Sequence, residues 1–215
     1  MSVYGTKSPI LTRCRACTGA SSAGARLDGM PLSPATIVAA AVAILDEYGL
    51  GDLTMRRLAD ALDVKPGALY WHFPTKQALL AAVADHVLRD AAVPVPSLAL
   101  PDWCRAWATD LRQVLLSHRD AAELVASARA MDLGSLDPVA PLTARLVTAG
   151  HPVGDADAAA QAFLHFVLGH VTQEQTRAQL LTLGVLGTVD RERSEHQFHH
   201  GLELLIRGVR SIDFE

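Results

Sequence analysis

Hydrophobic positions recur at intervals of three and four along most of the chain after residue 30, which is the period of an α-helix. The first predicted helix runs from Ser33 to Tyr48, with Ser33 suited to cap it and Pro34 to occupy its first turn. Gly49 and Gly51 end it. Its apolar stripe consists of Ile37, Ala40, Ala41, Ile44 and Leu45.

Two short helices follow, separated by a tight turn. The first begins at Thr54, whose hydroxyl can accept a hydrogen bond from the helix start, and ends near Leu62. The second runs from Lys65 to about Trp71, because Pro66 lacks a backbone N–H and therefore fits the first turn of a helix. Two helices with so short a connection are typical of a helix-turn-helix, whose second helix enters the major groove of DNA.

Side chains around the second helix are of kinds that contact nucleic acids. The small residues Gly67 and Ala68 allow a close approach to base edges, and the polar tips of Tyr70 and His72 can bond phosphate oxygens. Arg56 is the expected direct contact with guanine. An aromatic core patch is the structural alternative, but four ring-bearing residues in a row cannot all face inward. The candidate DNA-binding residues are Thr54, Arg56, Lys65, Gly67, Ala68, Tyr70, Trp71, His72 and Lys76.

The amino-acid sequence of this region contains motifs that are specific enough to indicate a family. From residue 53 the chain reads L-T-M-R-R-L-A-D-A-L-D-V, then G-A-L-Y-W-H-F, then T-K-Q-A-L-L. On these residues the segment from Leu32 to Leu80 resembles the DNA-binding domain of the tetracycline repressor (TetR) family of bacterial regulators. The resemblance implies an all-helical, homodimeric repressor that a small molecule releases from a double-stranded DNA operator.

The rest of the chain also reads as helical, so the predicted fold class is all-α. A helix from Thr75 to about Ala92 connects to a proline-rich loop at residues 93–101. This divides the chain into a head, residues 31–92, with a helix-turn-helix and its connecting helix, and a body, residues 93–215, for ligand binding and dimerisation. The three-helix core of the head is expected to include Leu53, Leu58, Leu62, Val64, Leu69 and Phe73. The body helices are predicted at 102–117, 119–130, 138–150, 155–183 and 194–211, with a charged loop at 190–193.

The last predicted helix carries apolar residues at the spacing of an a/d seam, continued by Ile212. One face packs on its own body, but the apolar surface is wider than one face. We expect this helix and the long helix before it to pair with their copies in a second subunit, as a two-fold four-helix bundle. The expected dimer-interface residues are Phe163, Val167, Phe198, Leu202, Leu205 and Val209.

The body segments L-S-H-R-D, F-L-H-F-V-L-G-H and G-L-E-L-L-I-R-G-V resemble the body of the tetracycline repressor itself. The resemblance places Val125 where that repressor has a magnesium-binding histidine and Trp107 where it has a drug-binding asparagine. It also leaves Arg129 and His165 at matching positions. The predicted inducer is therefore an apolar or aromatic small molecule near Trp107, Arg129 and His165, and not magnesium–tetracycline. The structural alternatives are a core tryptophan, a surface arginine and a satisfied buried histidine.

The net charge of the chain does little to alter the predicted fold and function. The chain of 215 residues has a net charge of −4 and is half hydrophobic, so it is no polybasic nucleic-acid binder overall. The window from Thr54 to Lys76 nevertheless holds four cations against two acids, a local balance of +2. No nucleophile elbow, phosphate loop or zinc-protease motif supports an enzyme, and no cofactor is expected.

Residues 1–30 are rich in small and polar residues, with four cations against Asp28 alone. We interpret them as a disordered basic arm. The arm could contact DNA, but we favour the alternatives that it has no function or that translation starts at Met30. No signal peptide or membrane helix is expected, which favours the cytoplasm.

A metal- or redox-responsive regulator remains the rival hypothesis. It would use the C-x-x-C pair Cys14 and Cys17, or the late histidines His196, His199 and His200, which share one helix face. A lone C-x-x-C provides only two of the four ligands of a structural zinc site. For the histidines we favour a place at the rim of the dimer.

Overall fold

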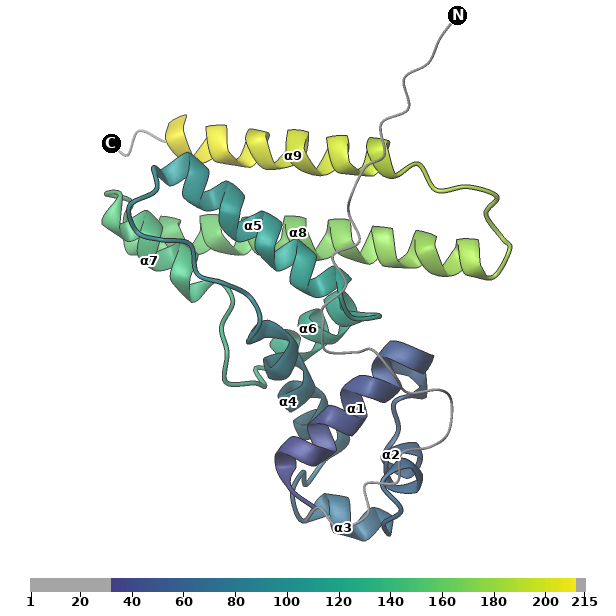
Figure 1. Ribbon diagram of the computed structural model, residues 1–215. Helices are drawn as coiled ribbons and strands as arrows, with labels where there is room; N and C mark the ends of the chain where they lie inside the picture. The colour runs from purple at the N-terminus through teal and green to yellow at the C-terminus, as the bar shows by residue number, and fades with distance from the viewer. Residues whose placement is uncertain (1–31, 212–215) are drawn as a thin grey trace, which may run out of the picture. The chain divides into compact units, whose positions relative to one another are not determined.

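The computed structural model describes residues 32–211, with side chains from Leu32 to Val209. Within these residues the fold is entirely helical, as predicted, with nine α-helices, one 3₁₀ turn (Leu50–Asp52) and no β-strand (Figure 1). The predicted arm with Cys14 and Cys17, and Ile212, lie outside the described residues. The helices are α1 (Pro34–Tyr48), α2 (Met55–Ala61), α3 (Pro66–Tyr70), α4 (Lys76–Leu88), α5 (Leu100–Leu116), α6 (Ala121–Ala130), α7 (Ala140–Thr148), α8 (Val153–Thr182) and α9 (Arg191–Ser211).

Local side-chain caps fix where the helices of the head begin. The hydroxyls of Ser33, Thr54 and Thr75 each accept a hydrogen bond from the backbone N–H three residues later, at 3.0–3.2 Å. Pro34 and Pro66 occupy the first positions of α1 and α3. Each of these bonds satisfies a donor that the helix itself leaves unpaired. The structure confirms the helix starts predicted for the head. They could be predicted because these capping signals act within one turn of chain.

The head closes around a small apolar core. Helix α1 packs on α2 and α4, and α2 packs on α3. Leu62 and Val64, both expected in this core, are half-buried at its edge. Its fully or largely buried residues are Ile37, Ala41, Ile44, Leu45, Leu53, Leu58, Leu69 and Phe73.

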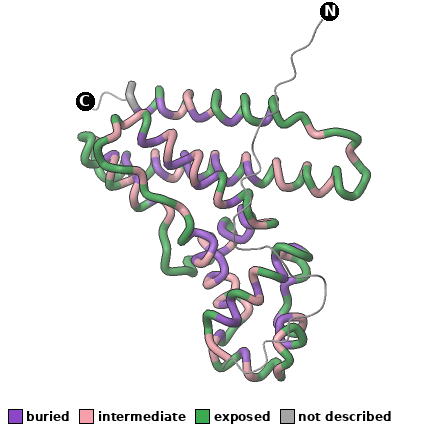
Figure 2. Tube along the Cα trace, in the orientation of Figure 1, coloured by how far each residue is buried: buried purple, intermediate pink, exposed green. Residues whose placement is uncertain are grey.

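The body is arranged around the 30-residue helix α8, which packs against α5, α6, α7 and α9 (Figure 1). Helix α5 also packs on α7 and α9. Buried and exposed residues alternate around these helices, so that each turns an apolar stripe to its neighbours (Figure 2). None of the described helices combines the length and apolar character that crossing a membrane requires.

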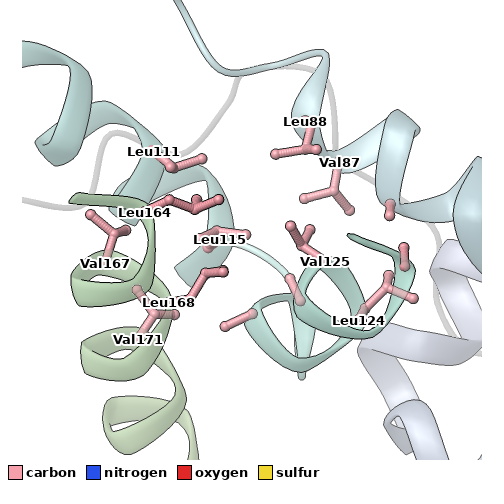
Figure 3. Close-up of a cluster of buried hydrophobic side chains, with 14 of the residues drawn as sticks. Val87, Leu88, Leu111, Leu115, Leu124, Val125, Leu164, Val167, Leu168 and Val171 are labelled. Atoms are coloured by element: carbon pink, nitrogen blue, oxygen red, sulfur yellow. The ribbon is translucent and has the colours of Figure 1, made fainter. Parts of the chain in front are cut away.

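Head and body share one continuous apolar core at the end of α4. Helix α4 packs on α1, α5 and α6, and Val87 and Leu88 near its end lie among body residues (Figure 3). Because protein interiors are closely packed, a displacement of α6 cannot leave α4 unaffected. The body residues of this cluster are Leu111, Leu115, Leu124, Val125, Leu164, Val167, Leu168 and Val171 (Figure 3).

A polar joint ties the end of α1 to the turn between α5 and α6. The backbone N–H of Leu50 donates to the Asp120 carboxylate at 2.8 Å, and His118 Nδ1 lies 3.1 Å from the Asp46 carboxylate. Gly49 has a φ of +89°, and a Cβ there would lie 2.6 Å from the Asp120 carboxylate. Glycine is therefore required at this joint by both backbone conformation and space.

Several helix ends differ from the predictions. Helix α4 stops at Leu88 and not near Ala92, whose N–H donates to the Asp110 carboxylate at 2.6 Å. The prediction of a loop over residues 190–193 is wrong for its last three residues, since α9 begins at Arg191. The reason is Asp190, whose carboxylate accepts a hydrogen bond from the N–H of Arg193 at 2.9 Å and so caps the helix.

Candidate nucleic-acid interface and ligand pocket

The α2–α3 hairpin exposes large rings. Trp71 is 90% exposed and Tyr70 is 47% exposed, whereas Leu69 and Phe73 are only 0% and 9% exposed. Leu69 and Phe73 anchor the segment to the core, with the Phe73 N–H donating to the Leu69 carbonyl at 2.9 Å, and Tyr70 and Trp71 between them face outward. An almost fully exposed tryptophan forgoes its hydrophobic stabilisation, which is typical of a surface that meets a partner.

Of the three cationic side chains on the hairpin, one is held in an ion pair and two form no ion pair with the described residues. Arg57 lies 3.2 Å from the Asp52 carboxylate and its guanidinium sits 4.2 Å from the centre of the Tyr48 ring. Arg56 and Lys65 are exposed and form no ion pair with any described residue. Their positive charges are therefore available for phosphate or base contacts.

The predicted DNA-binding residues mostly lie at the surface of the hairpin. A Cβ added to Gly67, in the first turn of α3, would meet no atom within 4 Å. No contact with residues 32–209 therefore requires glycine at Gly67, and its backbone is open to a close approach from outside. The exposed members of the set are Thr54, Arg56, Lys65, Gly67, Tyr70 and Trp71; Ala68, His72 and Lys76 are half-buried.

A cavity of about 290 Å³ lies between the end of α4, helix α5 and the loop that joins α6 to α7. We call it the Trp107 cavity. The Trp107 side chain is 4% exposed and its indole N–H donates to the Pro138 carbonyl at 3.2 Å. The cavity is lined by Leu88, Arg89, Ala91, Ala92, Val93, Trp107, Leu111, Leu136, Asp137, Pro138 and Pro141.

The other two predicted ligand residues lie differently. Arg129 contacts Asp137, a cavity residue, through an ion pair and also donates to the Gln161 side chain at 3.3 Å. It therefore supports the wall of the Trp107 cavity from outside. His165 is exposed on α8 and is not among the residues that line this cavity.

A buried carboxylate on α4 holds the same loop. Asp85 is 8% exposed and accepts hydrogen bonds from the Ser135 N–H at 2.8 Å, the Ser135 hydroxyl at 2.7 Å and the Leu136 N–H at 3.0 Å. Leu136 in turn lines the Trp107 cavity. The connecting helix of the head is thus bonded to the wall of the cavity. The available sequence signal was an acid within the apolar run of α4, which our predictions did not use.

Comparisons with known proteins agree with this geometry. Residues 37–83 match the family described as "Bacterial regulatory proteins, tetR family", and residues 99–182 match "Tetracyclin repressor-like, C-terminal domain". The chain is 31% identical over 194 residues to the class D tetracycline repressor of Escherichia coli, covering 82% of this chain and 88% of that one. The chain belongs to the TetR family of bacterial regulatory proteins.

Two solved structures extend the comparison. BioQ with its natural double-stranded DNA operator is 42% identical, with a TM-score of 0.73 over 84% of this chain and 99% of that chain. A TetR variant of Acinetobacter baumannii AYE in complex with minocycline is 28% identical, with a TM-score of 0.72 over 86% and 100%. As a member of this family the protein is a DNA-binding transcriptional repressor, not an enzyme.

A buried ionic cluster in the body of this TetR-family regulator escaped the sequence predictions. Arg112 on α5 is 7% exposed and binds Glu174 of α8 at 2.7 Å and Glu195 of α9 at 2.8 Å. Its guanidinium lies 4.6 Å from the centre of the Phe198 ring. The Ser194 hydroxyl donates to Glu174 at 2.8 Å. The cluster therefore joins three helices.

Ionisation in this cluster follows from its contacts. Burial disfavours the charged form of Glu174, but hydrogen bonds from Arg112 and Ser194 outweigh it and keep the pKa of this carboxyl below its usual value. The Arg112 hydrogen bond likewise lowers the pKa of Glu195. Burial lowers the pKa of His170, whose Nε2 lies 3.8 Å from Glu174. The cluster thus holds both carboxylates in their charged form.

The structure corrects the predicted dimer interface. Five of its residues are at most 6% exposed within the single chain, so their side chains have no surface to offer a second subunit. Only Leu205 is half-buried. The a/d spacing therefore reports packing of α9 on its own body, the alternative that the sequence left open. The five residues are Phe163, Val167, Phe198, Leu202 and Val209.

The candidate metal and redox residues form no site within residues 32–209. The His196 and His200 rings are stacked with centres 5.9 Å apart, and His199 bonds Glu195 at 2.9 Å. No group of three or more potential ligands occurs among the described residues. Cys104 is buried, and burial raises the pKa of its thiol to about 11, so it is an unreactive core residue.

Proposed function

We propose that this regulator is a homodimer that leaves a palindromic operator when a small, largely apolar molecule binds in the Trp107 cavity. The observation that carries the proposal is the exposed α2–α3 hairpin, with Trp71 90% exposed beside cations that are free of ion pairs. The operator complex of the relative BioQ supports the DNA partner.

In this proposal each subunit inserts α3 into the major groove. The two hairpins contact successive grooves about 34–36 Å apart on one side of the duplex. Lys65, Tyr70, Trp71 and His72 contact mainly phosphates, which position the protein, while Arg56 reads guanine and the first turn of α3 lies against base edges.

The ligand is expected to differ from magnesium–tetracycline. Val125, at the position that the family resemblance assigns to the metal-binding histidine, is an apolar residue with 1% exposure and cannot bind a metal ion. The wall of the Trp107 cavity is mostly aliphatic and aromatic. The minocycline complex of a TetR relative supports a small-molecule site in a body of this kind.

Release from DNA requires that the cavity communicate with the hairpin. A ligand that contacts Leu136 or Asp137 displaces the α6–α7 loop, which Asp85 bonds to α4. A shift of α4 then changes the separation of the two hairpins. A coupling free energy of about 1–3 kcal/mol is enough for a large change in operator occupancy.

For the dimer, we propose that α8 and α9 contribute their outward apolar residues. Leu181 at the end of α8, its C-cap Leu183, and Leu204 on α9 are 40%, 74% and 56% exposed. Leu205, next to Leu204, is half-buried. In this proposal these exposed residues form the dimer interface, in place of the buried residues that the a/d spacing of the sequence suggested. Two copies of each helix form the two-fold bundle.

The decisive experiment measures binding of the purified protein to DNA from upstream of its own gene by fluorescence anisotropy. Tyr70→Ala is expected to weaken operator binding by about 1–3 kcal/mol without changing the dimer or its thermal stability. Tyr70→Phe, which keeps the ring, is the matched control and separates the ring from its hydroxyl. Unchanged affinity of Tyr70→Ala would show that this face does not meet DNA.

A further inference from the structure

The wall of the Trp107 cavity has one cation whose hydrogen-bonding groups are unused. The Trp107 indole N–H already donates to the Pro138 carbonyl. The Asp137 carboxylate forms an ion pair with Arg129 and accepts a hydrogen bond from the Val139 N–H at 3.2 Å. The Arg89 guanidinium, by contrast, makes no hydrogen bond or ion pair with any residue between 32 and 209.

Arg89 contributes to the lining of the Trp107 cavity from the end of α4. Arg89 is the C-cap of α4, with its backbone N–H bonded to the Asp85 carbonyl at 3.1 Å, and its side chain is exposed. It also lines a second cavity of about 440 Å³ between α1 and α4. A cation at a helix C-terminus is favourable in itself, but that role does not occupy the five N–H donors of a guanidinium.

We infer that the ligand of the Trp107 cavity is an organic acid with an apolar body. This inference rests on the function proposed above. The apolar part packs against Trp107, Leu88 and Leu111, and the acidic group pairs with Arg89. A guanidinium matches the geometry of a carboxylate or another oxyanion with two parallel hydrogen bonds, and no other free cation lines this cavity.

The size of the site agrees with a small molecule. The volume of about 290 Å³ lies just below the range of about 300–1,000 Å³ that is usual for small-molecule sites. Binding of the acid at Arg89 also acts on the last turn of α4, the helix that leads to the hairpin. Charge recognition and the signal to the head therefore use the same residue.

Two fluorescent probes with one aromatic skeleton test the inference on the full chain. 8-Anilinonaphthalene-1-sulfonate carries an acid group, whereas N-phenyl-1-naphthylamine lacks it. Arg89→Gln is expected to weaken binding of the sulfonate roughly three- to tenfold and to leave binding of the neutral probe unchanged. Arg193→Gln, which removes the same charge from an exposed position on α9, is expected to change neither.

A second variant locates the probes. Ala92 is exposed and lines the cavity, so Ala92→Phe is expected to weaken both probes by occupying the mouth. Circular dichroism and thermal melting check that each variant is folded. If Ala92→Phe weakens both probes but Arg89→Gln weakens neither, the acid inference is overturned and the cavity remains a ligand site. If Ala92→Phe weakens neither probe, both the cavity as a ligand site and the acid inference are overturned, whereas the DNA contacts proposed for Tyr70 are tested independently.

Discussion

Two tryptophans show how differently the head and the body of this regulator work. Trp71 in the head is 90% exposed, whereas Trp107 in the body is 4% exposed and has its N–H bonded to Pro138. The first leaves its aromatic ring open to the surface of the hairpin, and the second forms part of the wall of the Trp107 cavity. A residue type alone therefore says little about its role, because the role follows from what the surrounding helices cover.

The two regions are also stabilised differently. The head depends on helix caps and a small apolar core, and the ion pair between Arg57 and Asp52 lies at its surface. The body adds a buried ionic cluster around Arg112 that joins α5, α8 and α9. The comparison predicts that the body has a costly charge to remove, at Arg112, whereas the costly single changes in the head are losses of core packing.

The largest effect is expected in the body. Arg112→Ala removes a buried cation and leaves the half-buried Glu174 without its partner, which should lower the free energy of unfolding by about 3–5 kcal/mol. Arg105→Ala is the control, because Arg105 pairs with Glu203 and Asp102 but its side chain is 40% exposed. Loss of that surface pair should cost less than about 1 kcal/mol. Urea denaturation measures both, and similar losses for the two variants would contradict the distinction.

In the head, the matched pair is Leu69 and Trp71. Leu69→Ala removes a fully buried side chain and should destabilise the protein by about 2–5 kcal/mol. Trp71→Ala, two positions later, should change stability by less than about 0.5 kcal/mol and yet weaken operator binding. Thermal melting and anisotropy titrations separate the two effects. A large loss of stability in Trp71→Ala would mean that its ring packs within the protein.

The link between the regions should show the smallest effect. Asp85→Asn weakens the bonds to Ser135 and Leu136 and should destabilise the protein by about 1–3 kcal/mol. Hydrogen exchange at the amides of residues 135 and 136 should become faster, because the loop is held less firmly. Asp90→Asn, an exposed change just beyond α4, is the control and should leave those amides unchanged. Unaltered exchange in Asp85→Asn would remove the proposed route between cavity and hairpin.

Much of the head was predictable because its signals are local. The caps at Ser33, Thr54 and Thr75 and the prolines at 34 and 66 act within one turn of chain, and the structure confirms each start. The outward position of Tyr70 and Trp71 followed from the impossibility of burying four adjacent rings. The cap at Asp190 is equally local, but the charged run after it was wrongly interpreted as a loop.

The body was less predictable because its chemistry joins residues far apart in the chain. An apolar seam on α9 has the same period whether it packs on a second subunit or on its own α8, and only the fold assigned Phe198 and Leu202 to the latter. Arg112 and Glu174 are 62 residues apart, and Asp85 and Ser135 are 50 apart. No spacing rule connects such partners.

Helical periodicity, capping residues and the proline at 66 predicted an all-helical fold with a helix-turn-helix, because each depends on contacts within a few residues. The prediction of a regulator rested on the resemblance of the residues around Pro66 to the TetR family. Which apolar faces are covered, which charges are paired and where a cavity remains depend on the packing of helices that are distant in sequence. Those features required the tertiary structure, since burial is a property of the assembled fold and not of any single segment.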